Sequence, residues 1–268
     1  MVILFDIDET LLIEGEYPQN KDNIKSHMTD LIDRGHTLGI CTFRPFDENV
    51  RRVYSEYGLN GPLITEGGAC ISTKGDNNTF VTKLYDAPKG FGLKDKVKKC
   101  FESYLEDRGI STDVVISNDL TIKDAVIINA YRTAAPTIRI PEGLASEIPH
   151  ILEHLENNPA LDYLDIKVSS DNNLKIRMNP RYVNKIVAME RFFGEEKIIF
   201  ISDREKNLPM HNRNIVVYSV GEDKVFNEYC DKVFSPLGKG VEDILIKIKG
   251  EIEWKITKFY QTIVKSDG

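Results

Sequence analysis

The sequence VILFDIDET, residues Val2 to Thr10, determines how the rest of the chain is interpreted. Its apolar residues from Val2 to Ile7 predict a buried strand. Asp6 and Asp8 lie two residues apart where this strand ends. Two such carboxylates repel each other unless a cation or a proton separates their roles, and a divalent metal ion supplies that cation. From the residues alone, a pair of turn or helix-capping aspartates remains the alternative.

Strand and helix patterns alternate around this stretch. The first strand is followed by apolar residues at helical spacing, Ile24, Met28, Leu31 and Ile32, and then by an apolar run at residues 38–41. The same rhythm returns after about residue 180, with strand patterns at residues 197–201 and 215–220. Alternation of this kind predicts an α/β fold whose parallel sheet is covered by helices.

The central part of the chain has a different rhythm. Helix patterns at residues 93–105 and 144–155 each precede two strand patterns, at 114–117 and 125–131 and at 163–168 and 174–178. We therefore predict an inserted α+β domain of αββαββ order over residues 75–180, with polar borders. Residues 1–74 and 181–268 then form the core, and we expect the insert to move as a lid.

Composition excludes several classes of protein. The chain has 268 residues, of which 41% are hydrophobic and 29% charged, as in ordinary globular proteins. Its 35 Lys and Arg against 42 Asp and Glu give a net charge of −7, so we expect neither nucleic acid nor a membrane as a partner. The N-terminal apolar run is broken by Asp6 and Asp8, which argues against a signal peptide. The four cysteines show no metal-binding spacing, and we expect a cytoplasmic protein.

Three further polar residues follow strand or helix patterns. Thr42 ends the second predicted strand, where its hydroxyl either donates to a phosphoryl oxygen or accepts a backbone N–H as the cap of the following helix. Lys185 opens a helix pattern, which by itself is a weak signal because most lysines are solvated. Asp203 follows an apolar strand, and carboxylate oxygens at such a position suit magnesium.

The order of these four segments resembles the motifs of the haloacid dehalogenase superfamily of phosphohydrolases. Within it, the chain is most similar to the Cof-type sugar phosphatases, whose duplicated αββ cap is inserted where this sequence has its insert. The segments Pro62–Ala69, Cys230–Phe234 and Gly240–Asp243 also match that group. The resemblance covers the whole chain and implies a Rossmann-like core with an inserted cap domain.

The resemblance also implies a role for each residue of these segments. Asp6 is expected to attack phosphorus and form a phosphoaspartate, and Asp8 to protonate the leaving group and then activate water. Thr42 and Lys185 are expected to hold the phosphoryl oxygens, where electrostatics supplies most of the catalysis. Arg44 is a further expected substrate-binding residue.

A magnesium ion is the implied cofactor. The expected ligands are Asp6, the backbone carbonyl of Asp8, Asp203 and Asn207. Asn207 stands where the family usually has Asp, and Lys206 precedes it. An amide brings no charge, so we expect weaker metal binding and an unusually high magnesium requirement.

Two other positions depart from the Cof-type pattern. Glu9 stands where the group usually has Gly, and Phe43 replaces the usual Gly before Arg44. Phe43 is expected to narrow the entrance to the site and to change the substrate. Three arginines of the insert, Arg132, Arg139 and Arg177, are candidates for selecting the substrate, although the sequence does not orient them.

The sequence therefore predicts a magnesium-dependent phosphatase that hydrolyses a small phosphorylated metabolite, with a sugar phosphate favoured. A phosphosugar mutase is the alternative among enzymes, and a catalytically weak binding or regulatory protein is the alternative outside them. We expect a monomer or a homodimer, and a C-terminal helix around Trp254 that packs on the core or on a second subunit.

Overall fold

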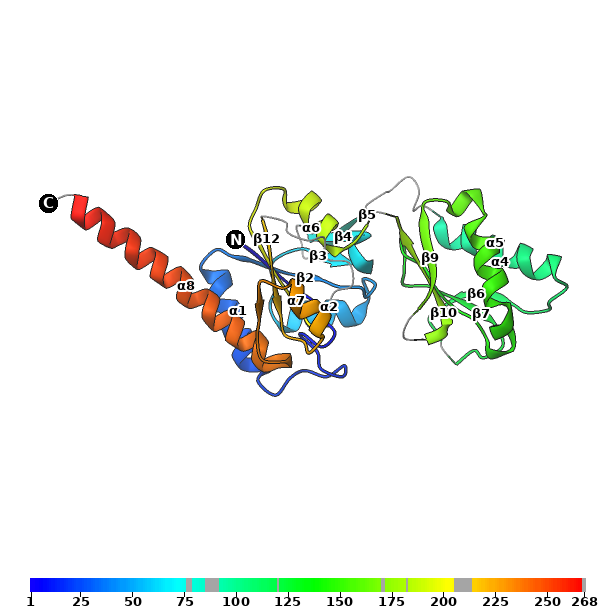
Figure 1. Cartoon of the computed structure of the whole chain (residues 1–268), viewed down its shortest axis with the longest axis horizontal. Helices are drawn as coiled ribbons and strands as arrows, with labels where there is room; N and C mark the ends of the chain where they lie inside the picture. The colour runs from blue at the N-terminus through cyan, green and yellow to red at the C-terminus, as the bar shows by residue number, and fades with distance from the viewer. Residues whose placement is uncertain are drawn as a thin grey trace. The chain divides into compact units, whose positions relative to one another are not determined.

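The computed structural model divides into two compact units. Figure 1 shows the helices and strands along the chain. The described residues are 1–75, 79–84, 92–119, 121–169, 172–181, 183–204 and 214–266, without the side chains of 254–266. The first unit comprises Met1–Thr42, Asn49–Pro62 and Phe193–Gly268, and the second comprises Phe43–Glu48 and Leu63–Phe192. The bounds that we assigned to the inserted domain, residues 75–180, stay a prediction.

The first unit is built on a parallel sheet. Its strands are β1 (Val2–Phe5), β2 (Thr37–Cys41), β11 (Ile198–Ser202), β12 (Ile215–Ser219) and β13 (Lys232–Val233). They run in the order β13-β12-β11-β1-β2, and every neighbouring pair is parallel. The residues of β1 and β11 are all buried, as expected of parallel strands that are covered on both faces. The predicted α/β fold with a Rossmann-like core is confirmed.

The described residues of this unit form the helices α1 (Lys21–Asp33), α2 (Glu48–Glu56), α7 (Lys224–Tyr229) and α8 (Leu237–Ser266). The apolar spacing predicted α1, which buries Ile24, Met28 and Leu31. Helix α8 runs beside α1 (Figure 1), where Asn20 donates to Glu242 at 2.6 Å and Lys249 pairs with Asp30. The side chain of Trp254 lies outside the described residues. Among the residues described, no helix combines the length and the apolar character that a membrane span requires.

The second unit begins with three antiparallel strands. These are β3 (Leu63–Thr65), β4 (Cys70–Lys74) and β5 (Phe80–Leu84), and the 3-10 turn η1 (Glu66–Gly68) joins the first two. The turn reverses the chain because Glu66, Gly67 and Gly68 all have positive φ, at 53°, 68° and 104°. Helix α6 (Lys185–Phe193) also belongs to this unit.

The α+β part of the second unit contains the predicted αββαββ elements. They are α4 (Leu93–Asp107), β6 (Val114–Ser117), β7 (Val126–Asn129), α5 (Ile148–Glu156), β9 (Leu164–Ser169) and β10 (Asn172–Pro180). One strand was not predicted, β8 (Thr137–Arg139), because its three residues lie between Pro136 and Pro141 and show no usable periodicity. The sheet order is β6-β7-β8-β10-β9.

A single apolar core joins this sheet to its helices. Val97, Phe101 and Leu105 of α4 and Ile151 and Leu155 of α5 pack against sheet residues that include Val126, Ile128, Ile138, Ile176 and Met178. Because side chains alternate along a strand, the strand residues that lie between these buried ones point to the opposite face of the sheet.

Candidate active site

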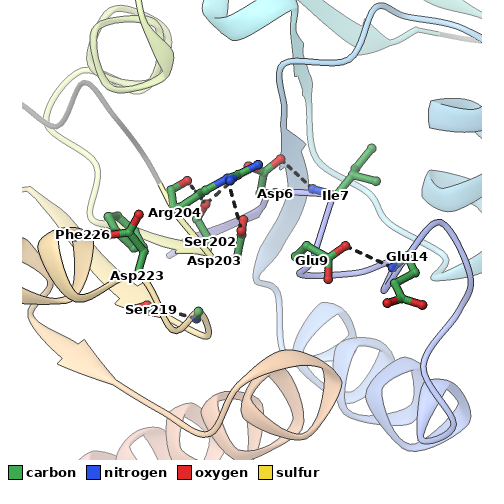
Figure 2. A network of polar contacts seen from close by, with 11 residues as sticks. Asp6, Ile7, Glu9, Glu14, Ser202, Asp203, Arg204, Ser219, Asp223 and Phe226 are labelled. Carbon is green, nitrogen blue, oxygen red and sulfur yellow. Dashed lines mark hydrogen bonds and ion pairs between the residues drawn. The ribbon is translucent and has the colours of Figure 1, made fainter. Parts of the chain in front are cut away.

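Asp6 is placed by the register of the parallel sheet. Strand β1 pairs with β11 so that Phe5 is opposite Ile201, and the Asp6 N–H continues the ladder to the Ile201 carbonyl at 2.9 Å. This pairing brings Asp6 beside Ser202, the last residue of β11, and Asp203, which follows it (Figure 2). Asp6 is a nearly buried carboxylate, with 7% of its surface exposed.

The Asp6 carboxylate is held in one orientation. Its Oδ1 accepts a hydrogen bond from the Ile7 N–H at 2.7 Å, and its Oδ2 lies 3.4 Å from the Ser202 hydroxyl (Figure 2). The same hydroxyl donates to the Arg204 carbonyl at 3.0 Å. Sequence reasoning gave no role to Ser202, since only the pairing of β1 with β11 reveals its contact with Asp6.

The turn after β1 separates Asp8 from Asp6. The Ile7 carbonyl accepts N–H groups from Leu11 and Leu12, both at 2.9 Å, and the intervening Asp8 is exposed. One carboxylate is therefore buried and oriented while the other faces solvent, which suits a nucleophile and a proton-transfer group. The turn also gives a reason for the glycine that the Cof-type group usually has at the position of Glu9. The φ of Glu9 is 53°, a conformation that Gly adopts without strain.

Asp203 lies against a glycine of the neighbouring strand connection. A β-carbon on Gly221 would be 1.8 Å from the Asp203 carbonyl oxygen, so only glycine fits at that position. The Asp203 carboxylate is 14% exposed and lies 3.7 Å from the Nε of the exposed Arg204 (Figure 2). The prediction that Asp203 follows an apolar strand is confirmed by β11.

The first unit thus brings four of the predicted site residues to one edge of its sheet. Phe5 is opposite Ile40 in β2, so the buried Thr42 follows β2 at the edge where Asp6 follows β1. Asp8 lies in the turn that follows β1, and Asp203 directly follows β11. Asn207 and Lys206, which we expected at the metal site, lie outside the described residues.

The donor atoms at this edge fit a magnesium ion. Asp6 and Asp203 offer carboxylate oxygens on neighbouring parallel strands, and the turn offers backbone carbonyls. Magnesium prefers such oxygens and keeps several waters, so it needs few protein ligands. Over the residues that the structure describes, no three side chains of His, Cys, Asp or Glu form a cluster typical of a metal site.

Lys185 and Arg44 belong to the second unit. Lys185 is the first residue of α6, as predicted, and is a fully covered cation with 1% exposure. Its ammonium lies 4.7 Å from the centre of the Phe43 ring. This ring also covers Gly67, where a β-carbon would be 2.6 Å from it. Phe43 therefore restricts the space around the lysine. The neighbouring residue Arg44 is held through its backbone carbonyl, which accepts the Glu66 N–H at 2.9 Å.

A buried glutamate in the same unit was not predicted. The Glu66 carboxylate accepts the consecutive N–H groups of Thr133, Ala134 and Ala135, at 2.7, 2.9 and 2.7 Å. Glu66 is 3% exposed, and burial together with its charge raises the pKa of the Cys70 thiol. The sequence signal that could have singled out Glu66 was its position between an apolar strand and two glycines.

Comparisons with known proteins agree with this architecture. The family described as haloacid dehalogenase-like hydrolase matches residues 3–210. A haloacid dehalogenase-like hydrolase from Bacteroides thetaiotaomicron superposes with a TM-score of 0.63 at 13% identity, over 92% of this chain and 98% of that chain. A HAD/COF-like hydrolase from Plasmodium vivax gives 0.56 at 14% identity, over 93% and 95%. A sugar phosphatase of HAD subclass IIB gives 0.56 at 16% identity, over 92% and 98%.

These structural similarities, at such low identity, show the fold. The predicted resemblance to Cof-type proteins with a core and an inserted cap is confirmed at that level. No curated protein matches the chain in sequence.

Proposed function

This chain belongs to the haloacid dehalogenase-like hydrolase family, and we propose that it is a magnesium-dependent phosphatase of small phosphorylated metabolites. The observation that carries the proposal is the pair of carboxylates after β1. Asp6 is buried and oriented by the Ile7 N–H, whereas Asp8 is exposed two residues further on. Different surroundings for two neighbouring carboxylates are what nucleophilic and acid–base catalysis require.

In the proposed reaction Asp6 attacks phosphorus through the carboxylate oxygen not held by the Ile7 N–H. The phosphorus–oxygen bond to the leaving alcohol breaks as the bond to Asp6 forms, and Asp8 gives its proton to the departing oxygen. Asp8 then takes a proton from water, which attacks the phosphoaspartate and releases phosphate. The two displacements regenerate the Asp6 carboxylate and the protonated Asp8.

The positive and hydrogen-bonding groups hold the transferred phosphoryl group. Thr42 would donate its hydroxyl to one phosphoryl oxygen, and the Lys185 ammonium would offset the negative charge of the others. Because Lys185 is buried, its charge is screened little by water. Arg44 would bind the same substrate.

A bound magnesium ion would be held by Asp6, Asp203, the Asp8 carbonyl and, from the sequence, Asn207, and would supply charge neutralisation. Without a cation, Asp6 and a phosphate dianion repel by about 1 kcal/mol per pair of charges at about 4 Å in water, and by more when desolvated. Asp6 and Asp203 follow two strands that pair with each other, which supports a shared ligand.

The test is phosphate release from a panel of phosphomonoesters, with and without magnesium. We expect turnover only with the metal and none in Asp6→Asn, with sugar phosphates among the substrates. Asp22→Asn, which removes an exposed carboxylate from α1, is the matched control and should keep full activity. Undiminished turnover in a folded Asp6→Asn protein would contradict the phosphoaspartate mechanism.

The same panel separates the alternatives. A phosphosugar mutase needs a bisphosphorylated activator, so release of phosphate from a monoester without one excludes it. No release from any ester, in a protein that binds magnesium, would instead favour a binding or regulatory role.

A further inference from the structure

The five-stranded sheet of the second unit carries cations on the face that α4 and α5 leave open. In β10, Ile176 and Met178 are fully buried in the apolar core, so Lys175 and Arg177 face the other side. Lys175 is paired with Arg139 of β8, and Arg177 with Lys167 of β9. The sequence could not orient Arg139 and Arg177, and this register places both on one face.

This arrangement puts like charges opposite each other. The pairs Lys175–Arg139 and Arg177–Lys167 are directly opposed across strands, which disfavours sheet pairing. The face is net basic, although Asp165 on it pairs with Lys167 at 2.6 Å and the chain as a whole has a net charge of −7. Such a concentration of positive charge suits an anionic ligand.

Arg132 lies next to this face and is held in place from two sides. Its guanidinium donates to the Phe43 carbonyl at 2.9 Å and to the Ala135 carbonyl at 3.4 Å. The residues after it, Thr133 to Ala135, are held by the Glu66 carboxylate. Burial lowers the pKa of Arg132, and the nearby charge of Arg177 lowers it further, against the opposing effect of Glu66.

The Arg132 guanidinium has capacity for another partner. It has five N–H groups, and the two carbonyls accept two of them. In the part of the chain that the structure describes, no carboxylate lies within ion-pair distance of it. The Glu66 carboxylate, its nearby negative charge, is occupied by three N–H groups.

Phe43 connects Arg132 to the expected phosphoryl-binding lysine. The Lys185 ammonium lies over the Phe43 ring and the Arg132 guanidinium is bound to the Phe43 carbonyl. Both cations therefore contact the same residue, Lys185 at its ring and Arg132 at its backbone carbonyl.

We propose that Arg132, with Arg177 beside it, binds a second anionic group of the substrate, so that the preferred substrates are phosphomonoesters that carry a carboxylate or another phosphate. A guanidinium binds either group through two parallel N–H···O bonds. Glu66 is then a positioning residue, because it holds the turn that carries Arg132. The inference rests on the proposed function, in which Lys185 binds the transferred phosphoryl group.

The experiment compares pairs of phosphomonoesters that differ in the second group. We would measure kcat and KM for 3-phosphoglycerate against glycerol 3-phosphate, and for fructose 1,6-bisphosphate against fructose 1-phosphate. The first pair reports on a carboxylate and the second on a phosphate. We expect the wild type to have a KM about tenfold lower or more for the member with the second anionic group in at least one pair, as one charged hydrogen-bonded contact gives.

The variants locate the effect. Arg132→Gln should raise the KM of the preferred ester by about 10- to 100-fold and leave its partner ester within about twofold. Arg132→Lys should recover part of the lost affinity, since lysine keeps the positive charge but cannot form the two parallel hydrogen bonds of a guanidinium. Arg108→Gln is the matched control: Arg108 pairs with Glu147 at 3.0 Å beside α4 and should not change either KM. Thermal melting shows whether each variant is folded.

Failure of this proposal differs from failure of the proposed function. Equal KM values within both pairs in the wild type, or an equal effect of Arg132→Gln on both members of a pair, would overturn the second-anion site. If no ester is hydrolysed, calorimetric titration of the protein with 3-phosphoglycerate and fructose 1,6-bisphosphate decides: binding that Arg132→Gln abolishes supports the site, and binding that is unchanged or absent in the wild type overturns it.

Discussion

Gly221 lies so close to Asp203 that a β-carbon on the glycine would be 1.8 Å from the Asp203 carbonyl oxygen. Gly221 follows β12, and Asp203 follows β11, the parallel neighbour of β12. The close approach lets the ends of these two strands pass each other, and the Val220 N–H reaches the Ser202 carbonyl at 3.0 Å. The position of an expected metal ligand therefore depends on the absence of a side chain on the next strand.

Gly221→Ala should displace the Asp203 backbone. We expect a loss of stability of about 1–3 kcal/mol, as in other overpacked sites, together with a rise in the magnesium concentration needed for half-maximal activity. Urea unfolding and magnesium titration measure the two effects. Gly143→Ala is the control, because a β-carbon there meets nothing within 4 Å. Equal stability and magnesium response in the two variants would contradict this account.

Asp8→Asn should lower kcat by about 100-fold or more, the usual contribution of a general acid–base group. The variant should fold normally because Asp8 is exposed. Steady-state kinetics on a substrate identified by the panel provides the measurement, and a melting curve checks folding. If kcat fell less than about threefold, proton transfer would have to be assigned to another group.

Glu9→Gly should stabilise the protein or leave it unchanged. Glycine relieves the left-handed conformation at φ 53°, a gain of about 1 kcal/mol, while the hydrogen bond from the Glu14 N–H to Glu9, 3.1 Å long, is lost. Glu9→Ala loses the same bond and keeps the strain, so it should be the less stable variant. Chemical denaturation of both proteins tests the order, and the reverse order would show that strain at this turn is unimportant.

The Cys70 thiol should stay protonated and unreactive well above neutral pH. Burial raises its pKa, and the charge of Glu66 raises it further, while burial raises the pKa of Cys230 to about 12. Because the thiolate is the reactive form, alkylation of both residues should remain slow up to about pH 9 in the folded protein. Mass spectrometry after iodoacetamide treatment measures the rate of alkylation at each cysteine, with urea-unfolded protein as the control. Rapid labelling of folded protein at pH 8 would contradict the expected burial.

The order of strands and helices could be predicted from sequence because it depends on local periodicity. Buried parallel strands show as continuous apolar runs and α1 as apolar residues three and four apart, so the core and most of the insert were predicted. Asp6, Asp8, Thr42 and Asp203 could be singled out for the same reason, since each follows a recognisable strand. Strand β8 was missed because three residues between prolines carry no period.

Contacts between distant residues were decided by the tertiary structure alone. Ser202 reaches Asp6 across 196 positions of sequence, and Glu66 reaches Ala134 across 68. The orientation of Arg139 and Arg177 depends on the register of β8, β9 and β10, and a shift of one residue would reverse the face that each occupies. Sequence by itself determined which chemical groups stand at the ends of the elements, because that is set along the chain. Strand pairing and close packing decided which of them meet, because those are set by residues far apart in the chain.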